Sequence, residues 1–348
     1  MSGQISRFHK FWVRLTQWEY WPLDVFYFPV KIYYIWLAIK NRSFFFFTSA
    51  NPALEFGGLT GERKSKIHEL IPQQYLPKSR LIAAGNLSDA KDFAAQIGFP
   101  LIAKPDIGER GKMVERVQDQ EELKAYVKKC PVDFLIQELV EYPIELGVFY
   151  MRHPNEARGS ITSIVQKDFL AVIGDGKSSV RQLLSKSSRA VLQVDFEHAR
   201  FSSVMGQVPG DGERVVVEAI GNHCRGTTFL NRNDQIDDRL EAAFDKLSRQ
   251  IDGFHYGRYD LRCASFDDLR ELKNFKIVEL NGAAAEPAHI YQPGFSLFKA
   301  YGVVFWHYSL LSQISAANRR RGFPYWKHRQ GMNKMKEVRA YNRLLRQA

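Results

Sequence analysis

Residues 275–282 read Phe-Lys-Ile-Val-Glu-Leu-Asn-Gly, an apolar strand-like run that ends in a carboxylate and an amide two positions apart. Side chains two positions apart point to the same face of a strand, so Glu279 and Asn281 can direct their oxygens toward one point. Upstream, residues 257–261 predict a second short strand, and Asp260 can join them if the two strands pair. Three hard oxygen ligands beside an apolar strand are typical of a Mg²⁺ site, although a strand running into a polar turn is the plainer alternative.

The region before this stretch alternates between strand and helix patterns. Residues 80–139 read as a strand (80–83), a helix (88–97), two strands (99–104 and 113–117), a helix (119–129) and a strand (134–139). We expect Ser88 to cap the first helix and Gly98 to end it. This β-α-β-β-α-β order predicts a small sheet with two helices on one face.

A larger unit follows in the sequence. Its strands are predicted at residues 145–150, 161–166, 169–173 and 215–220, with helices over 179–187 and 237–251. The two strands that carry the metal candidates come next. The 348 residues are enough for two or three lobes with a sizeable core, and the pattern as a whole predicts an α+β fold.

The composition limits the class of protein. A hydrophobic share of 45% and a charged share of 25% are ordinary for a globular chain. Cys130, Cys224 and Cys263 lie far apart, without metal or redox spacing, which favours a reducing compartment. The first residues show no apolar core before a small-residue cleavage site, so we expect a cytoplasmic protein.

Positive charge is concentrated at the two ends of the chain. The net charge is +11; residues 1–47 hold six Lys/Arg against two acids, and residues 318–348 hold ten against one. The middle of the chain is therefore close to neutral. The positive charge thus indicates what the two ends of the chain bind, and not what the central region binds. We expect anionic lipid headgroups or simple solvation for the C-terminal stretch. A nucleic-acid partner is not expected, because no recognisable nucleic-acid module accompanies the charge.

Aromatic residues crowd the first segment. Sixteen of them fall within residues 1–47, including the run Phe44–Phe47. Asp24, Pro22 and Pro29 interrupt the apolar stretch, which is shorter than the roughly 18–20 residues of a spanning helix. Three alternatives stay open: the aromatics pack on the body, they lie at a membrane interface, or a helix spans the membrane.

Four motifs in a fixed order resemble those of the ATP-grasp superfamily, over roughly residues 60–310. The strand at 99–105 with the glycine loop at 106–111 is similar to that family's phosphate-binding lysine and lid. Residues 134–140 are similar to its adenine hinge, and residues 143–148 to the strand whose glutamate holds the ribose. The later residues Arg258, Asp260, Glu279 and Asn281 match its arginine and metal ligands in order and spacing.

The resemblance implies an ATP-grasp fold, in which ATP lies between two α+β lobes. It divides the chain into an aromatic, basic N-terminal extension (1–58), a small lobe with a glycine-rich lid (59–140), a large lobe with the metal site (141–317) and a basic C-terminal tail (318–348). Relatives usually carry a further N-terminal domain that helps to bind the carboxylate substrate. Only the aromatic segment stands in that place here.

The resemblance also assigns roles to residues. Those expected to bind the nucleotide are Lys66, Lys104, Gly108, Gly111, Gln137, Glu138, Val140, Glu145 and Lys167. Of the cluster Arg63, Lys64 and Lys66, we favour Lys66 over Lys64 as the second ATP lysine, with an ordinary exposed face as the alternative. Arg258 and Lys104 are the expected catalytic residues, and Asp260, Glu279 and Asn281 the expected ligands of Mg²⁺ or Mn²⁺.

Elementary chemistry gives a parallel reason for the phosphate site. Lys104 follows an apolar strand, so a rigid base can hold its ammonium, and Pro105 then ends the strand. Gly108 and Gly111 let backbone amides approach phosphate oxygens and let the loop hinge. A solvated strand-end lysine is the alternative for Lys104.

Two further stretches resemble the ATP-grasp domains of cyanophycin synthetase and bifunctional glutathione synthetase, namely residues 171–180 and 221–228. The group joins a carboxylate to an amine through an acyl phosphate, so the resemblance implies an ATP- and Mg-dependent carboxylate–amine ligase. After Asn281 the chain lacks the Ser-Pro-Gly turn of D-alanine–D-alanine ligases, which leaves the substrates open. Glu286 and His289 are candidates to hold a substrate amine, with a polar turn as the alternative.

Other functions remain compatible with these motifs. The chain is alternatively a non-catalytic ATP-binding protein that docks to membranes, or a small-molecule kinase. As partners we expect small-molecule carboxylates and amines, and an anionic membrane surface through the termini. That contact would place the protein at the inner face of the membrane.

Overall fold

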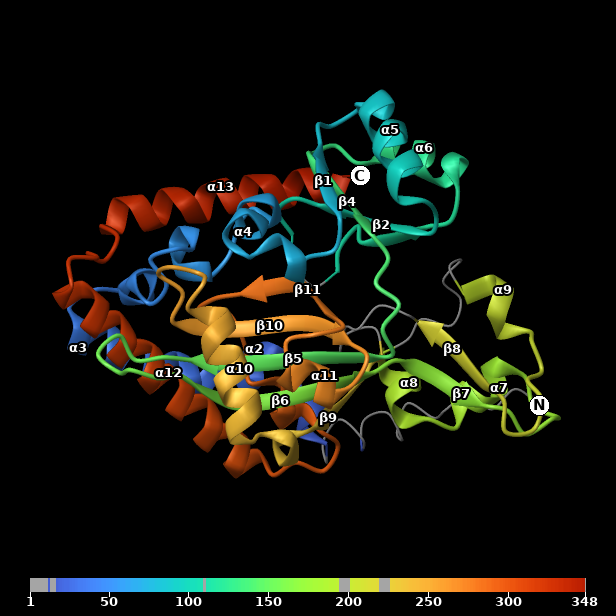
Figure 1. The fold of residues 1–348 in the computed structure, drawn as a ribbon. Coiled ribbons are helices and arrows are strands. Elements are labelled where there is room, and N and C mark those ends of the chain that lie inside the picture. The colour runs from blue at the N-terminus through green and yellow to red at the C-terminus, as the bar shows by residue number, and fades with distance from the viewer. Residues whose placement is uncertain (1–11, 13–16, 109–110, 194–200, 219–225, 348) are drawn as a thin grey trace.

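An antiparallel sheet forms the floor of the larger lobe in the computed structural model, which describes residues 12, 17–108, 111–193, 201–218 and 226–347 (Figure 1). Its order is β11 (Phe275–Asn281), β10 (Tyr256–Cys263), β5 (Ile144–Met151), β6 (Ser160–Asp168) and β9 (Thr228–Asn231). The strands that carry the metal candidates are thus hydrogen-bonded neighbours, with Asp260 directly opposite Glu279.

The large sheet is buried on both faces because alternate residues of its central strands enter two different cores. On β5, Val148 and Tyr150 pack in a core that includes α10 (Asp238–Ser248), whereas Phe149 packs in another that includes α3 (Phe28–Asn41) and α12 (Leu297–Arg320). Figure 1 shows α10 in front of the sheet and α12 behind it.

The small lobe has the predicted architecture. Its sheet has the order β1 (Ser79–Ile82), β4 (Phe134–Glu138), β2 (Leu101–Pro105) and β3 (Glu115–Val117), with α5 (Leu87–Ile97) and α6 (Gln120–Lys129) against it. The predicted cap of α5 is corrected, since the side chain of Asn86, two residues before Ser88, accepts the Asp89 amide. The predicted fold class, α+β with two lobes, is confirmed.

A third, two-stranded sheet extends from the large lobe. It pairs β7 (Leu170–Ile173) with β8 (Arg214–Glu218), and α7 (Val180–Ser185), α8 (Ser188–Gln193) and α9 (Ser202–Met205) pack beside it. Ser179 and Gln182 form a reciprocal capping box at the start of α7. Residues 221–225 of the glycine–threonine segment lie outside the described residues, and β9, where that segment ends, was not predicted.

The aromatic N-terminal segment packs in part on the body. It contains η1 (Trp18–Tyr20), α2 (Leu23–Phe26), α3 and η2 (Phe46–Ser49), and it buries Trp18, Phe26 and Phe45–Phe47. The remaining short elements are η3 (Glu55–Gly58), α4 (Lys64–Leu70), η4 (Gln73–Tyr75), η7 (Asn233–Gln235), α11 (Phe266–Arg270) and η8 (Ala288–Tyr291). Across the described part of the chain, the helices are too short or too polar to cross a bilayer.

The basic C-terminal stretch is a long helix, α13 (His328–Gln347), that runs along both lobes (Figure 1). Gly331 lies against the ring of Phe45, and Lys334 forms an ion pair of 2.6 Å with Glu55. At its far end Leu345 enters the core of the small lobe. The helix therefore connects the N-terminal segment to the small lobe, a role that its charge did not indicate.

Candidate active site

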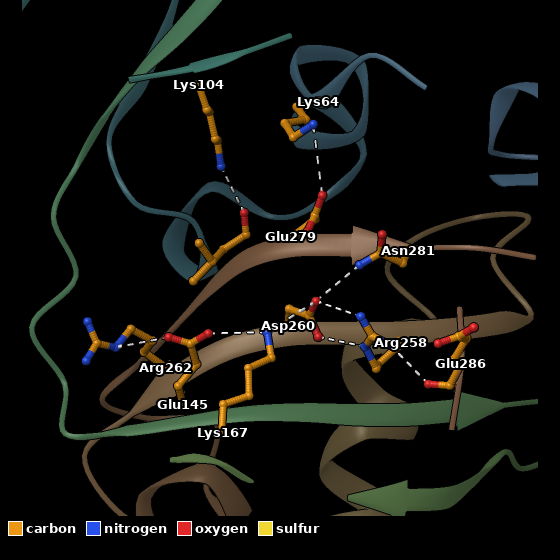
Figure 2. A network of polar contacts seen from close by, with 11 residues as sticks. Lys64, Lys104, Glu145, Lys167, Arg258, Asp260, Arg262, Glu279, Asn281 and Glu286 are labelled. Carbon is orange, nitrogen blue, oxygen red and sulfur yellow. Dashed lines mark hydrogen bonds and ion pairs between the residues drawn. The ribbon is translucent and has the colours of Figure 1, made fainter. Parts of the chain in front are cut away.

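A cavity of about 670 Å³ lies between the two lobes and takes its lining from both, and from the N-terminal segment as well. One end is charged, and Figure 2 shows its side chains pointing toward one another from the small lobe and from the strands of the large sheet. The other end is aromatic. We call these the charged end and the aromatic end of the cleft.

Alternating residues of β10 build the floor of the charged end. Arg258, Asp260 and Arg262 all line the cleft, as side chains two positions apart on a strand must share a face. Arg258 donates to both oxygens of Asp260, at 2.7 and 3.0 Å, in a two-pronged ion pair. The same guanidinium donates to the backbone oxygen of Glu286 at 3.0 Å (Figure 2). Arg258 is thereby fixed at the boundary between the two ends.

A glycine makes room for this ion pair. Gly147 on β5 is directly opposite Asp260. A methyl group at Gly147 would lie 3.0 Å from Arg258 Cδ, 3.2 Å from Asp260 Oδ1 and 2.9 Å from Val165 Cγ1. Those distances are tighter than ordinary van der Waals contact, so the position must lack a side chain for the pair to form as it does.

A β-bulge on β11 aims its backbone at the small lobe. The register shifts so that Asp260 faces Glu279 while the next residue, Leu261, faces Ile277, which leaves Val278 as the extra residue. Lys104, from β2 of the small lobe, donates to the carbonyl of Val278 at 3.2 Å (Figure 2). The bulge thus places the two lobes in direct contact at the charged end.

Lys104 is held in an unfavourable environment for its charge. Burial lowers its pKa to about 8, with Lys64 contributing in the same direction and Glu279 opposing. His68 lies near both lysines, and burial together with their charges lowers its pKa to about 3. A buried ammonium with few partners of opposite charge is well suited to an anionic ligand.

Lys167 on β6 lies in the opposite electrostatic situation. Its ammonium is 3.2 Å from Glu145 and 3.5 Å from Asp260. Although burial opposes it, the attraction of Asp260 and Glu145 raises the pKa of Lys167. For Asp260, burial again opposes the shift, and Arg258 and Lys167 together lower its pKa. Both groups are therefore charged at neutral pH.

The three expected metal ligands all line the charged end, with Glu279 directed toward Lys64 and Asn281 toward Asp260 (Figure 2). Asp260 and Glu279 are cross-strand partners, and the amide nitrogen of Asn281 donates to Asp260 at 3.3 Å, which leaves the amide oxygen as its ligating atom. Among the described residues, no group of three or more His, Cys, Asp or Glu side chains is placed to hold a metal. Two carboxylates and an amide nevertheless fit Mg²⁺, which commonly completes its shell with substrate phosphates and water.

The structure places Lys64, and not the favoured Lys66, at the cleft. Each residue of a helix is rotated by about 100° from the one before it. Lys64 and Lys66 are two positions apart on α4, so their side chains point in nearly opposite directions. Lys64 lines the cleft, donates to the Gly108 carbonyl at 2.8 Å and lies 3.9 Å from Glu279. Lys66 is exposed and pairs with Glu69. The buried side of α4 carries Ile67 and His68, a pattern that was readable in the sequence.

The segment expected to form the adenine hinge, residues 134–140, differs in detail from the prediction. Gln137 is buried and lines the cleft, and its side-chain oxygen has no hydrogen-bond partner in the described structure. Val140 lines the cleft, with its carbonyl bonded to Arg262. The backbone N–H of Glu138 already donates to Lys78 at 2.9 Å, and Leu139 rather than Glu138 lines the cleft. Because the N–H of Glu138 is already used, its expected backbone contact with adenine would have to come from its carbonyl.

The glycine loop borders the cleft above the charged end. Gly108 and Gly111 both line it, and Gly111 has a φ of 67°, a conformation that glycine adopts without strain. Residues 109–110, including Arg110, lie outside the described residues. Glu145, the expected ribose ligand, lines the cleft from β5.

The aromatic end was not predicted from the sequence. Its walls come from the N-terminal segment, β9 and η8, and comprise Trp18, Tyr20, Trp21, Phe26, Phe229 and Tyr291. Glu19 and Glu286 are acids of this end, and the carboxylate of Glu286 accepts hydrogen bonds from the hydroxyls of Tyr27 and Tyr291. His289 is buried, and burial lowers its pKa to about 4, so it is neutral at pH 7.

Arg262 was also missed, although its spacing was a usable signal. It continues the two-residue alternation that begins at Arg258, and it lies opposite Glu145 on β5, with Nε 3.9 Å from the carboxylate. By contrast, nothing local in the sequence indicated that Trp18 and Tyr291 meet.

Comparison with known proteins gives low-identity matches. No family model matches the chain. A 92-residue segment, 25% of this chain, is 29% identical to part of the carbamoyl phosphate synthase large chain of Archaeoglobus fulgidus and covers 9% of that protein. At this coverage the match concerns one segment and not the whole activity.

Solved structures are similar over most of the chain. They include a bifunctional glutathione synthetase from Pasteurella multocida (12% identity, TM-score 0.39, 70% of this chain and 35% of that one). A D-alanine–D-alanine ligase from Bacillus anthracis matches at 14% identity and TM-score 0.40, over 74% of this chain and 67% of that one. The ATP-grasp ligase PsnB, complexed with a precursor variant, Mg and ADP, matches at 12% and 0.38, over 72% and 58%.

Proposed function

We propose that this chain is an ATP- and Mg-dependent ligase that joins a carboxylate to an amine through an acyl-phosphate intermediate. One observation carries the proposal: Lys104 and Lys64 from the small lobe face Asp260 and Glu279 of the large lobe across a single cleft. Cations on one side and oxygen ligands on the other are what a metal-bound triphosphate requires.

The adenine and ribose positions follow from the hinge. The unpaired, buried side-chain oxygen of Gln137 is an acceptor for an exocyclic amino group, because a buried polar atom without a partner is costly. Leu139 and Val140 supply an apolar edge beside it, and Glu145 supplies a carboxylate for the ribose hydroxyls. Lys167 holds Glu145 in place.

Asp260, Glu279 and Asn281 would hold Mg²⁺, and the same oxygen set accepts Mn²⁺. When bound, Mg·ATP supplies the phosphoryl group that activates a carboxylate. The chain's own lysines, Lys64 and Lys104, would neutralise phosphate oxygens.

Arg258 is placed to stabilise the oxyanion when an amine attacks the activated carbonyl. Its guanidinium stands where the charged end meets the aromatic end. One well-placed donor of this kind lowers the reaction barrier by roughly 3–4 kcal/mol. The aromatic walls would exclude the water that hydrolyses an acyl phosphate.

The substrates bind at the aromatic end. Glu286 supplies a carboxylate for a substrate ammonium, and its two tyrosine partners keep it oriented. Burial raises the pKa of Tyr27 and of Tyr291, so both hydroxyls stay protonated and continue to donate. A small carboxylate and an amine with an apolar body fit these surroundings best.

The test begins with thermal denaturation in Mg·ATP. A ligand at a hundred times its Kd stabilises the folded form by about 2.7 kcal/mol, so Mg·ATP should raise the melting temperature of the wild type. Asp260→Ala and the milder Glu279→Gln should lose that rise, whereas Glu69→Gln, at an exposed ion pair, should keep it. If Mg·ATP stabilises both site variants as much as the wild type, the proposed site is wrong.

Turnover is tested by ADP release with a panel of amino acids and small carboxylates, followed by hydroxamate trapping of the acyl phosphate. Trapped hydroxamate supports ligation. ADP release without it identifies a small-molecule kinase, and Mg·ATP binding with no ADP release on any substrate identifies a non-catalytic ATP-binding protein. The expected contact with an anionic membrane does not depend on the cleft.

A further inference from the structure

Helix α3 presents a continuous apolar stripe to solvent. Phe28, Ile32, Ile35, Trp36 and Ile39 are between 52% and 71% exposed. Their spacings of three and four residues place them on one side of the helix. The opposite side, with Val30, Leu37 and Ala38, is buried against the body. We call the exposed stripe the α3 face; large exposed apolar patches mark interaction sites.

The charges carried by α3 and the residue that follows it are all positive. Residues 28–42 contain Lys31, Lys40 and Arg42 and no Asp or Glu. The ammonium of Lys40 lies 5.3 Å from the ring centre of Trp36, so its stem covers the stripe while its charge stays at the edge. Lys31 pairs with Asp24 at an exposed site, an interaction that is weak in water. Apolar side chains flanked by lysine and arginine are complementary to an anionic lipid surface.

The α3 face is connected to the aromatic end of the cleft by a continuous series of ring contacts. Ring contacts of 4.9–5.9 Å between centroids run without interruption along Trp36, Tyr33, Phe305, Tyr301, Phe26 and Trp18. The last two of these line the cleft. An orientation imposed on α3 is therefore imposed on the cleft.

We propose that the α3 face is a docking surface for an anionic lipid bilayer, on which α3 lies in the plane of the headgroups. Since the described helices are too short or too polar to cross a bilayer, the contact is peripheral. The five apolar side chains of the α3 face would enter the boundary between headgroups and acyl chains, and the flanking cations would meet the anionic headgroups. This surface goes beyond the proposed ligase activity and stands whether or not the cleft is catalytic.

The experiment is flotation of the full-length protein with vesicles of phosphatidylcholine containing phosphatidylglycerol, compared with vesicles of phosphatidylcholine alone. We expect the wild type to bind the anionic vesicles at least about tenfold more strongly, because Lys31, Lys40 and Arg42 are attracted to anionic headgroups. Ile32→Glu/Ile39→Glu should reduce binding by at least about tenfold, because two charges then enter the apolar layer. Ile173→Glu/Val208→Glu is the matched control, since both positions are exposed and lie outside α3.

Three results with vesicles would overturn the proposal. These are no binding of the wild type to anionic vesicles, equal binding of the α3 double variant, and an equal loss in the control. A dimer in analytical ultracentrifugation that only the α3 double variant dissociates would also overturn it, by showing that the face pairs with a second copy. The Mg·ATP melting shift, measured on the same variants, reports separately on the cleft, so failure of the ligase proposal and failure of this one are distinguishable.

Discussion

The two ends of the cleft are built in different ways. The charged end depends on strand alternation and cross-strand register, so Arg258, Asp260 and Arg262 share a face because they are two residues apart. The aromatic end depends on segments that are distant in the chain, such as Trp18 and Tyr291. The difference teaches that the side chains gathered by one strand pair can be predicted from local sequence. The shape of a substrate-binding wall instead depends on the assembled tertiary structure.

Substitution of Gly147 tests whether the charged end depends on close packing between neighbouring strands. Gly147→Ala should reduce ADP release by about a thousandfold, the cost of displacing one preorganised electrostatic group, because the new methyl group displaces the Arg258–Asp260 pair. The measurement is kcat for ADP release with the best substrate of the panel.

The matched control is Gly302→Ala on α12, where a methyl group meets open space. It should keep full activity and gain roughly 0.5–1 kcal/mol of stability. Unchanged activity in Gly147→Ala would show that the ion pair tolerates displacement. The charged end would then not depend on close packing between neighbouring strands.

The buried charge of Lys104 gives the charged end a pH dependence that an aromatic wall lacks. Its folded-state pKa of about 8 lies below the unfolded value of about 10.5. The protonated lysine therefore destabilises the folded state fully below pH 8, and this penalty disappears as pH rises from 8 to 10.5. At pH 7, Lys104→Met should be more stable than the wild type by about 3 kcal/mol.

Urea denaturation at pH 7, 9 and 10 measures this effect. The stability gap between Lys104→Met and the wild type should narrow steadily across the series. Lys66→Met, at an exposed position, should show a gap near zero at every pH. A gap for Lys104→Met that stays constant with pH would contradict the assignment of a destabilising buried ammonium.

The aromatic end should respond to truncation in a more limited way. Trp21→Ala should raise KM for the best substrate by about tenfold, through lost apolar contact, and leave the Mg·ATP melting shift unchanged. Phe323→Ala, at an exposed aromatic residue outside the cleft, is the control. If Trp21→Ala instead abolishes the melting shift, the two ends are not separate binding regions.

Much of the charged end could be predicted from local sequence. The small lobe, the strands that carry Asp260 and Glu279, and the fold class follow from alternation and from turn residues. The position of Lys64 is also locally predictable, because Ile67 and His68 lie three and four residues after it and mark the buried side of α4. The bulge at Val278, which aims a carbonyl at Lys104, arises from pairing with β10 and leaves no clear mark in one strand.

By itself, the sequence determined which side chains share a strand face, because the backbone alternation of two residues is local and nearly invariant. It also determined that the ends of the chain are basic and that the N-terminal segment is aromatic. Only the tertiary structure decided which of those aromatic residues line a cleft and which face solvent on α3. Burial depends on contacts between segments hundreds of residues apart, and no local pattern specifies those contacts.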